Sequence, residues 1–150
     1  MMKMAEQRDR AHYSVGLFIV LLLVGFGVSL ILPRFRVEGM KESRVSWYGG
    51  NFHGRRAASG QLYNMLDLTA AHCARPLGGW LRITNLDNNS SVIVRITDRG
   101  PYQVDRDGRV VRPLQPHPRR EVDLSYSAAR KLGLLRSGVA KARIEYLVKY

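Results

Sequence analysis

Three side chains in this sequence have the types and settings needed for acid–base chemistry: His72, Asp98 and Asp123. Asp98 ends a β-branched run and precedes Arg-Gly-Pro, and Asp123 stands in a Val-Asp-Leu-Ser segment. When two carboxylates share a site, the pKa of one of them rises and that group can donate a proton. Paired carboxylates of this kind are the usual means of breaking a glycosidic bond. Asp98 and Asp123 could therefore form such a pair if the fold brings them together, and His72 is a third candidate for proton transfer.

Each of these residues also has a purely structural explanation. Asp123 can cap a helix together with Ser125, and Asp98 can bind Arg99 or the backbone amides of a turn. His72 can be a half-buried histidine bonded to a backbone carbonyl. The alternatives differ in the partners that they give to each side chain.

A predicted β-hairpin positions Asp98. Residues 80–86 and 91–97 flank the turn sequence at 87–90, and the second run has Val92, Val94 and Ile96 at alternate positions. This alternation places the apolar side chains on one face of a strand. The second strand therefore delivers Asp98 at its end, at the rim of a sheet or barrel.

The rest of the folded part is also predicted to be short strands. Residues 139–148 alternate again and form the natural closing strand. Between the hairpin and this strand, Ser125 can cap a short helix over 126–132 that ends at Gly133. The pattern as a whole indicates an all-β fold with one short helix.

A long loop separates Asp98 from Asp123. Residues 103–120 have no apolar periodicity and are rich in proline and arginine. Loops of this length without regular structure are usually functional or disordered. The sequence leaves open whether the segment covers a substrate or is a solvated insertion.

An apolar run without a charged side chain occupies residues 13–32. A helix of about 20 residues spans the hydrocarbon core of a membrane, roughly 30 Å. The alternative is a cleaved signal peptide, whose apolar region is usually about 7–15 residues long and ends in a small-residue site. The longer run favours an uncleaved anchor. We therefore predict a tail at 1–12, a transmembrane helix over 13–32, a linker at 33–43 and one folded domain at 44–150.

The chain is strongly basic, with 24 Lys and Arg against 12 Asp and Glu and a formal net charge of +12. Such a surface attracts polyanions in general, including nucleic acid, anionic lipid and the carboxylates of a cell-wall polymer. Because no recognised nucleic-acid motif is present, no specific nucleic-acid partner is expected. The single Cys73 cannot form an internal disulfide, and His53, His117 and Cys73 lack metal-ligand spacing. No metal or cofactor is predicted.

Seven short motifs in a fixed order carry the strongest signal. They are Ser46-Trp-Tyr-Gly49, Phe52-His-Gly-Arg55, Ser59-Gly-Gln-Leu-Tyr-Asn-Met65, Leu68-Thr-Ala-Ala-His72, Arg82-Ile-Thr-Asn-Leu86, Val94-Arg-Ile-Thr-Asp-Arg-Gly-Pro101 and Val122-Asp-Leu-Ser125. Together they resemble the rare lipoprotein A (RlpA-like) family, from about Val45 to Val148 and interrupted by the insertion at 103–120. The resemblance implies a six-stranded double-psi β-barrel that cleaves peptidoglycan glycan strands as a lytic transglycosylase, in which the sugar's own 6-hydroxyl replaces water.

The resemblance also assigns roles to particular residues. In active members the cleft carries a Glu, a His and an Asp, which correspond here to Gln61, His72 and Asp98. Gln61 keeps the shape of Glu and can bind sugar, but an amide does not transfer a proton near neutral pH. Asp123 is the candidate replacement, because related double-psi barrels use an Asp in a similar Asp-Leu motif.

Four more residues beside the motifs are candidate substrate contacts, in addition to Gln61. Tyr48 and Tyr102 are aromatic side chains that can stack on sugar rings. Arg55 and Arg99 are cations that can pair with the carboxylates of peptide stems.

Two functions follow from this resemblance. The first is a lytic transglycosylase, anchored in the inner membrane with its C-terminal domain in the periplasm, whose chemistry is carried by Asp98 with assistance from His72. The second is a catalytically inactive peptidoglycan-binding or scaffold module of an envelope assembly with protein partners. Gln61 is the residue that separates the two.

Overall fold

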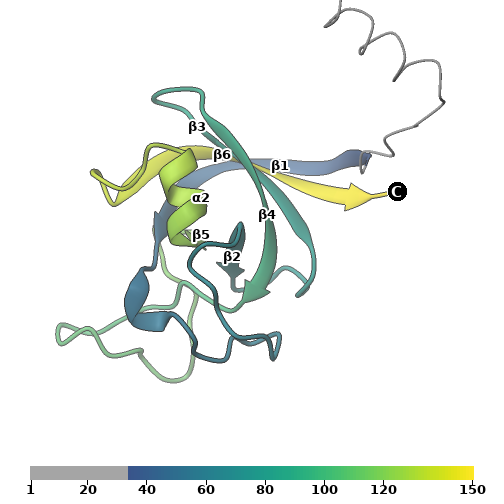
Figure 1. The fold of residues 1–150 in the computed structure, drawn as a ribbon. Coiled ribbons are helices and arrows are strands. Elements are labelled where there is room, and N and C mark those ends of the chain that lie inside the picture. Colours follow the sequence, from purple (N-terminus) through teal and green to yellow (C-terminus); the bar gives the residue numbers. More distant parts are fainter. Residues whose placement is uncertain (1–33) are drawn as a thin grey trace, which may run out of the picture. The chain divides into compact units, whose positions relative to one another are not determined.

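Six strands close into a barrel in the order β1-β5-β2-β4-β3-β6 (Figure 1). The computed structural model describes residues 34–150, which form a compact unit of their own. The elements are β1 (Phe35–Trp47), the 3-10 helix η1 (Gly50–Phe52), β2 (Thr69–His72), β3 (Trp80–Asn85), β4 (Ser91–Asp98), β5 (Val122–Leu124), the α-helix α2 (Tyr126–Lys131) and β6 (Val139–Lys149). The prediction of an all-β, six-stranded barrel with one short helix is confirmed.

The predicted tail at 1–12 and transmembrane helix over 13–32 lie outside the described residues. Within residues 34–150, no helix combines the length and the apolar character needed to cross a membrane.

Two pairs of neighbouring strands in the barrel are parallel, and four are antiparallel. The parallel pairs are β1 with β5 and β2 with β4. The antiparallel pairs are β1 with β6, β2 with β5, β3 with β4 and β3 with β6. Because the short strand β2 lies between β4 and β5, the ends of these two strands share one neighbour.

The predicted hairpin forms as β3 and β4. Val92, Val94 and Ile96 of β4 are each at most 5% exposed, so they face the core as their alternation predicts. Buried side chains of β3 and β6, such as Ile83 and Ile144, fill the same core. Burying each such side chain contributes roughly 1.5–3 kcal/mol relative to leaving it in water.

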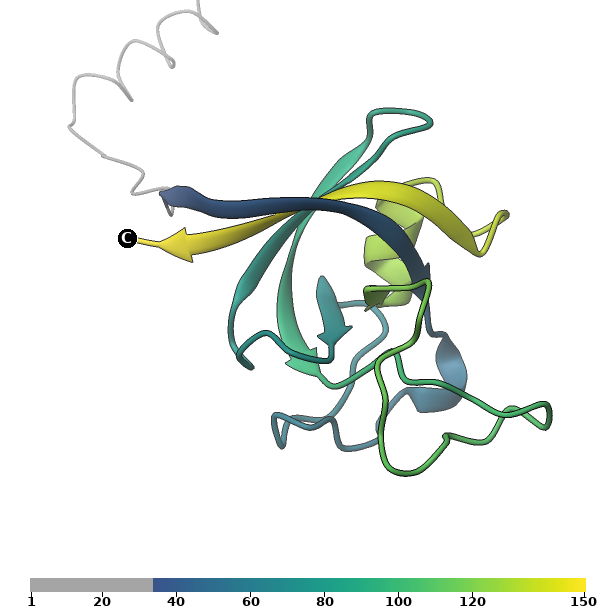
Figure 2. The ribbon, with the colours of Figure 1, turned by 180° about the vertical axis from the view of Figure 1, so that it is seen from behind.

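The predicted linker at 33–43 is wrong over most of its length. Residues 35–43 form the first part of β1 and pair with β6, from Phe35 opposite Lys149 to Ser43 opposite Ala142. Figure 2 shows this part of β1 beside the end of β6, close to the C-terminus. The side chains of this part of β1 are exposed or half-buried, so the strand lacks the apolar alternation that would identify it. The folded unit therefore begins at about residue 34 and not at 44.

The predicted helix forms as α2 with the expected caps. The Ser125 side chain accepts a hydrogen bond from the Ala128 amide at 3.4 Å. The Ser125 hydroxyl also donates to the Asp67 carbonyl at 2.6 Å, which ties the preceding loop to the helix. Gly133 follows the helix with φ +68°, a conformation that favours glycine.

Two long segments lie at one end of the barrel (Figure 1): the loop 48–68 and the segment 99–121, here called the arm. The arm contains no named helix or strand, as predicted. Isolated bridges pair Tyr102 with Pro116 and Val104 with Val110, so the arm folds back on itself. It leaves the end of β4 and returns to the start of β5.

Candidate functional site

Asp98 and Asp123 lie level with each other on the two sides of β2. Ala71 is the register partner of Asp98 in β4 and also of Asp123 in β5. Neighbouring strands are about 4.8 Å apart, so roughly 10 Å separates the two Cα atoms. Asp123 lies between the core residues Val122 and Leu124, so it faces away from the core. In β4 a register shift between Ile96 and Asp98 interrupts the alternation that would turn Asp98 toward the core. Both carboxylates lie near the phenol of Tyr48 and raise its pKa. The structure therefore places both carboxylates on one outer face.

Two backbone amides hold one oxygen of Asp98. Its Oδ1 accepts hydrogen bonds from the Ala58 amide at 2.9 Å and from the Arg99 amide at 2.8 Å. These two hydrogen bonds confirm the alternative in which Asp98 binds backbone amides. The bond from Ala58 also ties the loop around that residue to the end of β4. Among residues 34–150, no hydrogen bond involves Oδ2. That oxygen is available to a ligand.

Asp123 belongs to a small polar cluster. The Ser46 hydroxyl donates a hydrogen bond to Asp123 Oδ1. Arg120 Nη1 donates to Ser46 Oγ at 3.0 Å and lies 3.8 Å from the same carboxylate oxygen. The alternative in which Asp123 caps the helix is wrong, because the side chain that caps α2 is that of Ser125.

Tyr48 lies close to both carboxylates. Burial raises the pKa of its phenol, and the nearby Tyr63, Asp98 and Asp123 raise it further. Its ring packs on Tyr63 with 4.6 Å between centroids and meets Phe52 edge-on at 5.8 Å. Within the described part of the chain, its buried hydroxyl has no hydrogen-bond partner. Because aromatic neighbours cover the ring and the hydroxyl is buried near Thr69, Tyr48 packs beside the carboxylates and does not present the predicted stacking face.

Gln61 lies on the same side of the barrel as Asp98. It lines a pocket of about 280 Å³ together with Ala58 and Thr97, which are next to Asp98 in space or in sequence. The Ser59 amide donates to the Thr97 carbonyl at 3.0 Å and fastens this loop to β4. The structure therefore brings Gln61 and Asp98 to the same part of the surface.

His72 lies on the opposite face of β2. Its register partner is the core residue Val122, and it is only 3% exposed. Nδ1 accepts the amides of Ala74 and Arg75, each at 3.1 Å, and Nε2 lies 3.3 Å from Glu121 Oε1. Burial lowers the pKa of His72 below its ordinary value of 6.5; Arg75 lowers it further and Glu121 opposes the shift. The structure thus separates His72 from the two aspartates, and its ring binds backbone amides, not a carbonyl.

A family model described as lytic transglycolase matches residues 41–144. The chain belongs to this family. It is 40% identical over 111 residues to the endolytic peptidoglycan transglycosylase RlpA of Vibrio cholerae serotype O1, covering 73% of this chain and 37% of the relative. It is 44% identical over 101 residues to the protein of the same name from Pseudomonas aeruginosa strain UCBPP-PA14, covering 67% and 26%. The chain thus spans well under half of these relatives.

Solved structures show the same fold at low identity. The Streptomyces papain inhibitor superposes with a TM-score of 0.52 at 18% identity, over 73% of this chain and 96% of that chain. An expansin of Clavibacter michiganensis superposes with a TM-score of 0.50 at 16% identity, over 75% of this chain and 50% of that chain. The RlpA-like double-psi β-barrel expected from the motifs is therefore confirmed.

The other predicted contacts of this RlpA-like domain have mixed placements. Arg99 Nη1 donates to the carbonyls of His72 at 3.1 Å and Arg75 at 2.7 Å, so Arg99 holds the turn after β2. Arg55 is exposed, with its guanidinium 5.5 Å from the centre of the Phe52 ring. Tyr102 is half-buried at the start of the arm.

Four residues near the site were missed by sequence reasoning: Ser46, His117, Arg120 and Glu121. Burial and Arg120 lower the pKa of His117, while nearby Asp123 opposes this shift, so the returning half of the arm lies close to Asp123. For three of them, the signal that could have found them is their position in or next to a motif. Ser46 opens the first motif, and Arg120 and Glu121 directly precede the motif that contains Asp123.

Within residues 34–150, no group of three His, Cys, Asp or Glu side chains is placed to hold a metal ion. Cys73 is half-buried and donates its thiol to the Pro101 carbonyl at 3.0 Å. Burial raises the pKa of this thiol, which keeps it protonated and unreactive.

Proposed function

We propose that this RlpA-like domain binds and cleaves the glycan strands of peptidoglycan as a lytic transglycosylase. The observation that carries the proposal is the row formed by Asp98, Ala71 and Asp123, which presents two carboxylates on one outer face. The loop 48–68 and the arm lie at this end of the barrel (Figure 1), so both are placed to contact a glycan strand bound at the two carboxylates. The relatives named endolytic peptidoglycan transglycosylase RlpA support the reaction class.

The chemistry needs one group that first donates and then accepts a proton. A protonated carboxyl gives its proton to the bridging oxygen as the bond from that oxygen to the anomeric carbon breaks. The resulting carboxylate then takes the proton of the sugar's 6-hydroxyl, whose oxygen bonds to the anomeric carbon and closes an anhydro ring. No water is consumed.

Asp98 suits this role because two amides fix Oδ1 and Oδ2 remains open to the substrate. Asp123, held by Ser46, supplies a second negative charge that stabilises the positive charge that develops on the sugar. His72 then acts as a positioning residue, since it binds the turn after β2 and not the open face.

One observation favours a second candidate function, a module that binds glycan strands without cutting them. Gln61 lines the pocket beside Asp98, at the position where the resemblance places a catalytic Glu. Its amide can hydrogen-bond sugar hydroxyls but cannot relay a proton. In this alternative the aspartates bind the strand, and envelope proteins are the partners of the module.

We also propose that residues 13–32 anchor the chain in the inner membrane, with the barrel in the periplasm. The apolar run supports the anchor. The side of the membrane follows from the proposed substrate, because peptidoglycan lies outside the inner membrane.

Incubation of the full chain with glycan strands, in one sample freed of peptide stems and in another intact, separates the two functions. Mass spectrometry reads anhydro ends, and sedimentation with the wall material reads binding. If the domain is a lytic transglycosylase, anhydro ends form with the wild type and disappear with Asp98→Asn. Retained sedimentation without any anhydro ends would instead establish the binding module, and the absence of both would refute the proposed function.

A further inference from the structure

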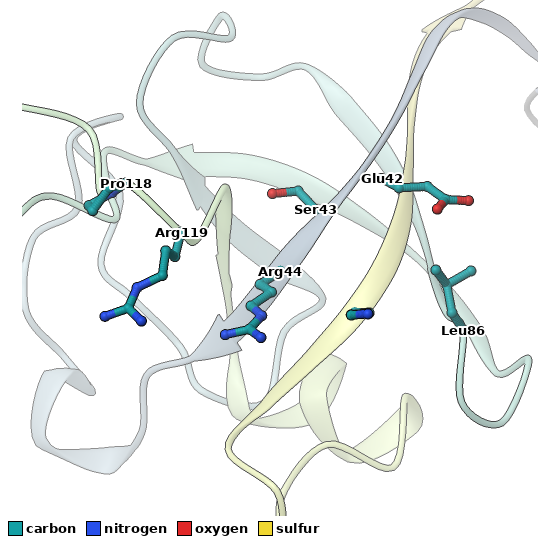
Figure 3. A pocket seen from close by; sticks show the side chains of 7 residues that line it. Glu42, Ser43, Arg44, Leu86, Pro118 and Arg119 are labelled. Carbon is teal, nitrogen blue, oxygen red and sulfur yellow. The ribbon is translucent and has the colours of Figure 1, made fainter.

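Glu121 is the last residue of the arm, and its side chain joins β1 to β2. Its Oε2 accepts a hydrogen bond from Lys41 Nζ of β1 at 2.7 Å, and its Oε1 lies 3.3 Å from Nε2 of His72 in β2. Its backbone amide donates to the Arg44 carbonyl at 2.9 Å. Figure 3 shows Arg44 and, on the returning arm, Arg119; both line a groove of about 510 Å³. The chemistry proposed above gives Glu121 no role.

The neighbours of the His72 ring decide which nitrogen carries the hydrogen. Nδ1 accepts the amides of Ala74 and Arg75, each at 3.1 Å, so this nitrogen has no hydrogen. In the neutral ring the hydrogen is therefore on Nε2, which faces Glu121. Nε2 is buried and has no hydrogen-bond partner within residues 34–150, so its interaction with the Glu121 carboxylate is electrostatic.

The charges around this ring act in opposite directions. Burial lowers the pKa of the His72 imidazole and Arg75 and Arg99 lower it further, whereas Glu121 raises it. The Lys41 side chain is 54% exposed, and an ion pair with so exposed a partner contributes little to stability. The pair with Lys41 therefore does not by itself explain why a carboxylate lies beside a buried histidine.

The turn after β2 connects His72 to Asp98. Arg99 Nη1 donates to the carbonyls of His72 and Arg75, so the turn whose amides bind the His72 ring also holds the Arg99 guanidinium. The backbone amide of Arg99 donates to Asp98 Oδ1 at 2.8 Å. A continuous series of contacts therefore runs from Glu121 through His72 to the carboxylate whose second oxygen is open.

We infer that Glu121 is a positioning residue for the reaction: it holds the His72 ring in the orientation that binds the turn, and through Arg99 it fixes the carboxylate of Asp98. This inference depends on the proposed function, because it takes Asp98 as the reacting group. In this role Glu121 needs no contact with the glycan strand. Its loss is expected to slow turnover and to leave strand binding intact, because a displaced reacting group affects the rate more than the affinity.

Two variants of the full chain, kept in mild detergent, test the role of Glu121. Glu121→Gln removes the charge and keeps an acceptor oxygen, whereas Glu121→Leu removes both. Glu42→Gln is a matched control, since it removes an exposed carboxylate of β1. A second control, Lys41→Gln, breaks the pair with Lys41 and leaves Glu121 beside His72.

NMR spectra of the labelled imidazole and carboxyl groups read the arrangement without any need for activity. In Glu121→Gln the pKa of His72 should be lower than in the wild type, because Glu121 raises it. In Glu121→Leu the carboxyl signal of Asp98 should shift, while both controls leave it in place.

Anhydro-product formation on stem-free strands supplies the second readout. Glu121→Leu is expected to lower kcat at least about tenfold with KM nearly unchanged, and Glu121→Gln to lose less. Adding His72→Gln to Glu121→Leu should slow the reaction little further, because both residues act through the same turn.

An Asp98 signal or a kcat in Glu121→Leu equal to that of the wild type would overturn the inference. So would a loss of the same size in Lys41→Gln, which would assign the effect to the ion pair. A wild type that forms no anhydro ends would instead refute the proposed function, and the Asp98 signal would still decide whether Glu121 positions that carboxylate.

Discussion

Asp98 and Asp123 occupy the same level of the barrel on two strands, β4 and β5, that are separated only by β2. They are 25 positions apart in the sequence, and the arm fills the interval. The barrel brings the two residues close in space because β2 pairs with both strands, in parallel with β4 and antiparallel with β5. The level of the two carboxylates is therefore set by the strands, while the two ends of the arm add contacts through Arg99 and Arg120.

Ser46→Ala removes the hydroxyl that holds Asp123. We expect a loss of about 1.5–3 kcal/mol in the free energy of unfolding, because a hydrogen bond to a charged group disappears. Denaturant unfolding measures this loss. Ser46→Thr keeps the hydroxyl and serves as the control, so an equal loss in both variants would show that the hydrogen bond contributes little.

Gln61→Glu restores a carboxyl group beside Asp98. We expect anhydro-product formation to rise by about 10²-fold or more, the usual contribution of a positioned acid–base group. The assay is the same mass-spectrometric measurement on stem-free strands. Gln61→Met, which removes hydrogen bonding and adds no carboxyl, is expected to weaken strand binding. An unchanged rate in Gln61→Glu would exclude Gln61 from the reacting centre.

The lowered pKa of His72 predicts that the stability of the fold depends on pH. Its pKa is lower in the folded chain than the ordinary 6.5, so the unfolded chain binds more protons between these two values. The contribution of His72 is therefore present above about pH 6.5 and is lost as the pH falls through the folded pKa. When the pH is lowered from 7.5 to 5, the melting temperature should fall less steeply in His72→Gln than in the wild type. His117→Gln is the comparison variant, since His117 also has a lowered pKa but is less deeply buried.

Truncation tests the corrected boundary of the domain. A chain that begins at residue 44 lacks the part of β1 that pairs with β6 from Phe35 to Ser43. We expect it to melt at a lower temperature than a chain that begins at residue 34. Equal melting temperatures would show that the ribbon formed by these two strands adds nothing to stability.

Local patterns predicted the parts of the fold that are themselves local. The hairpin of β3 and β4 joins residues close in sequence, and Val92, Val94 and Ile96 reveal its buried face. The Ser125 cap depends on a contact only three residues away. The first part of β1 was missed because it pairs with a strand about 100 residues later and exposes most of its side chains.

The site was predicted only in part, because several of its residues are also brought together by pairings between distant segments. The motifs identified Asp98 and Asp123, and the structure brings them to one face. The face of His72 could not be derived, because in a strand of four residues it depends on the register with β5. Ser46 and Arg120 were missed because their roles come from contacts with Asp123 across the barrel.

The most direct test of the central claim compares the rates of anhydro-product formation by the wild type, Asp98→Asn, Asp123→Asn and the double variant. If the two carboxylates act as one unit, each single variant loses about 10²-fold or more, and the double variant is barely slower than either. An active wild type whose rate survives in either single variant, or losses that simply multiply in the double variant, would contradict the account.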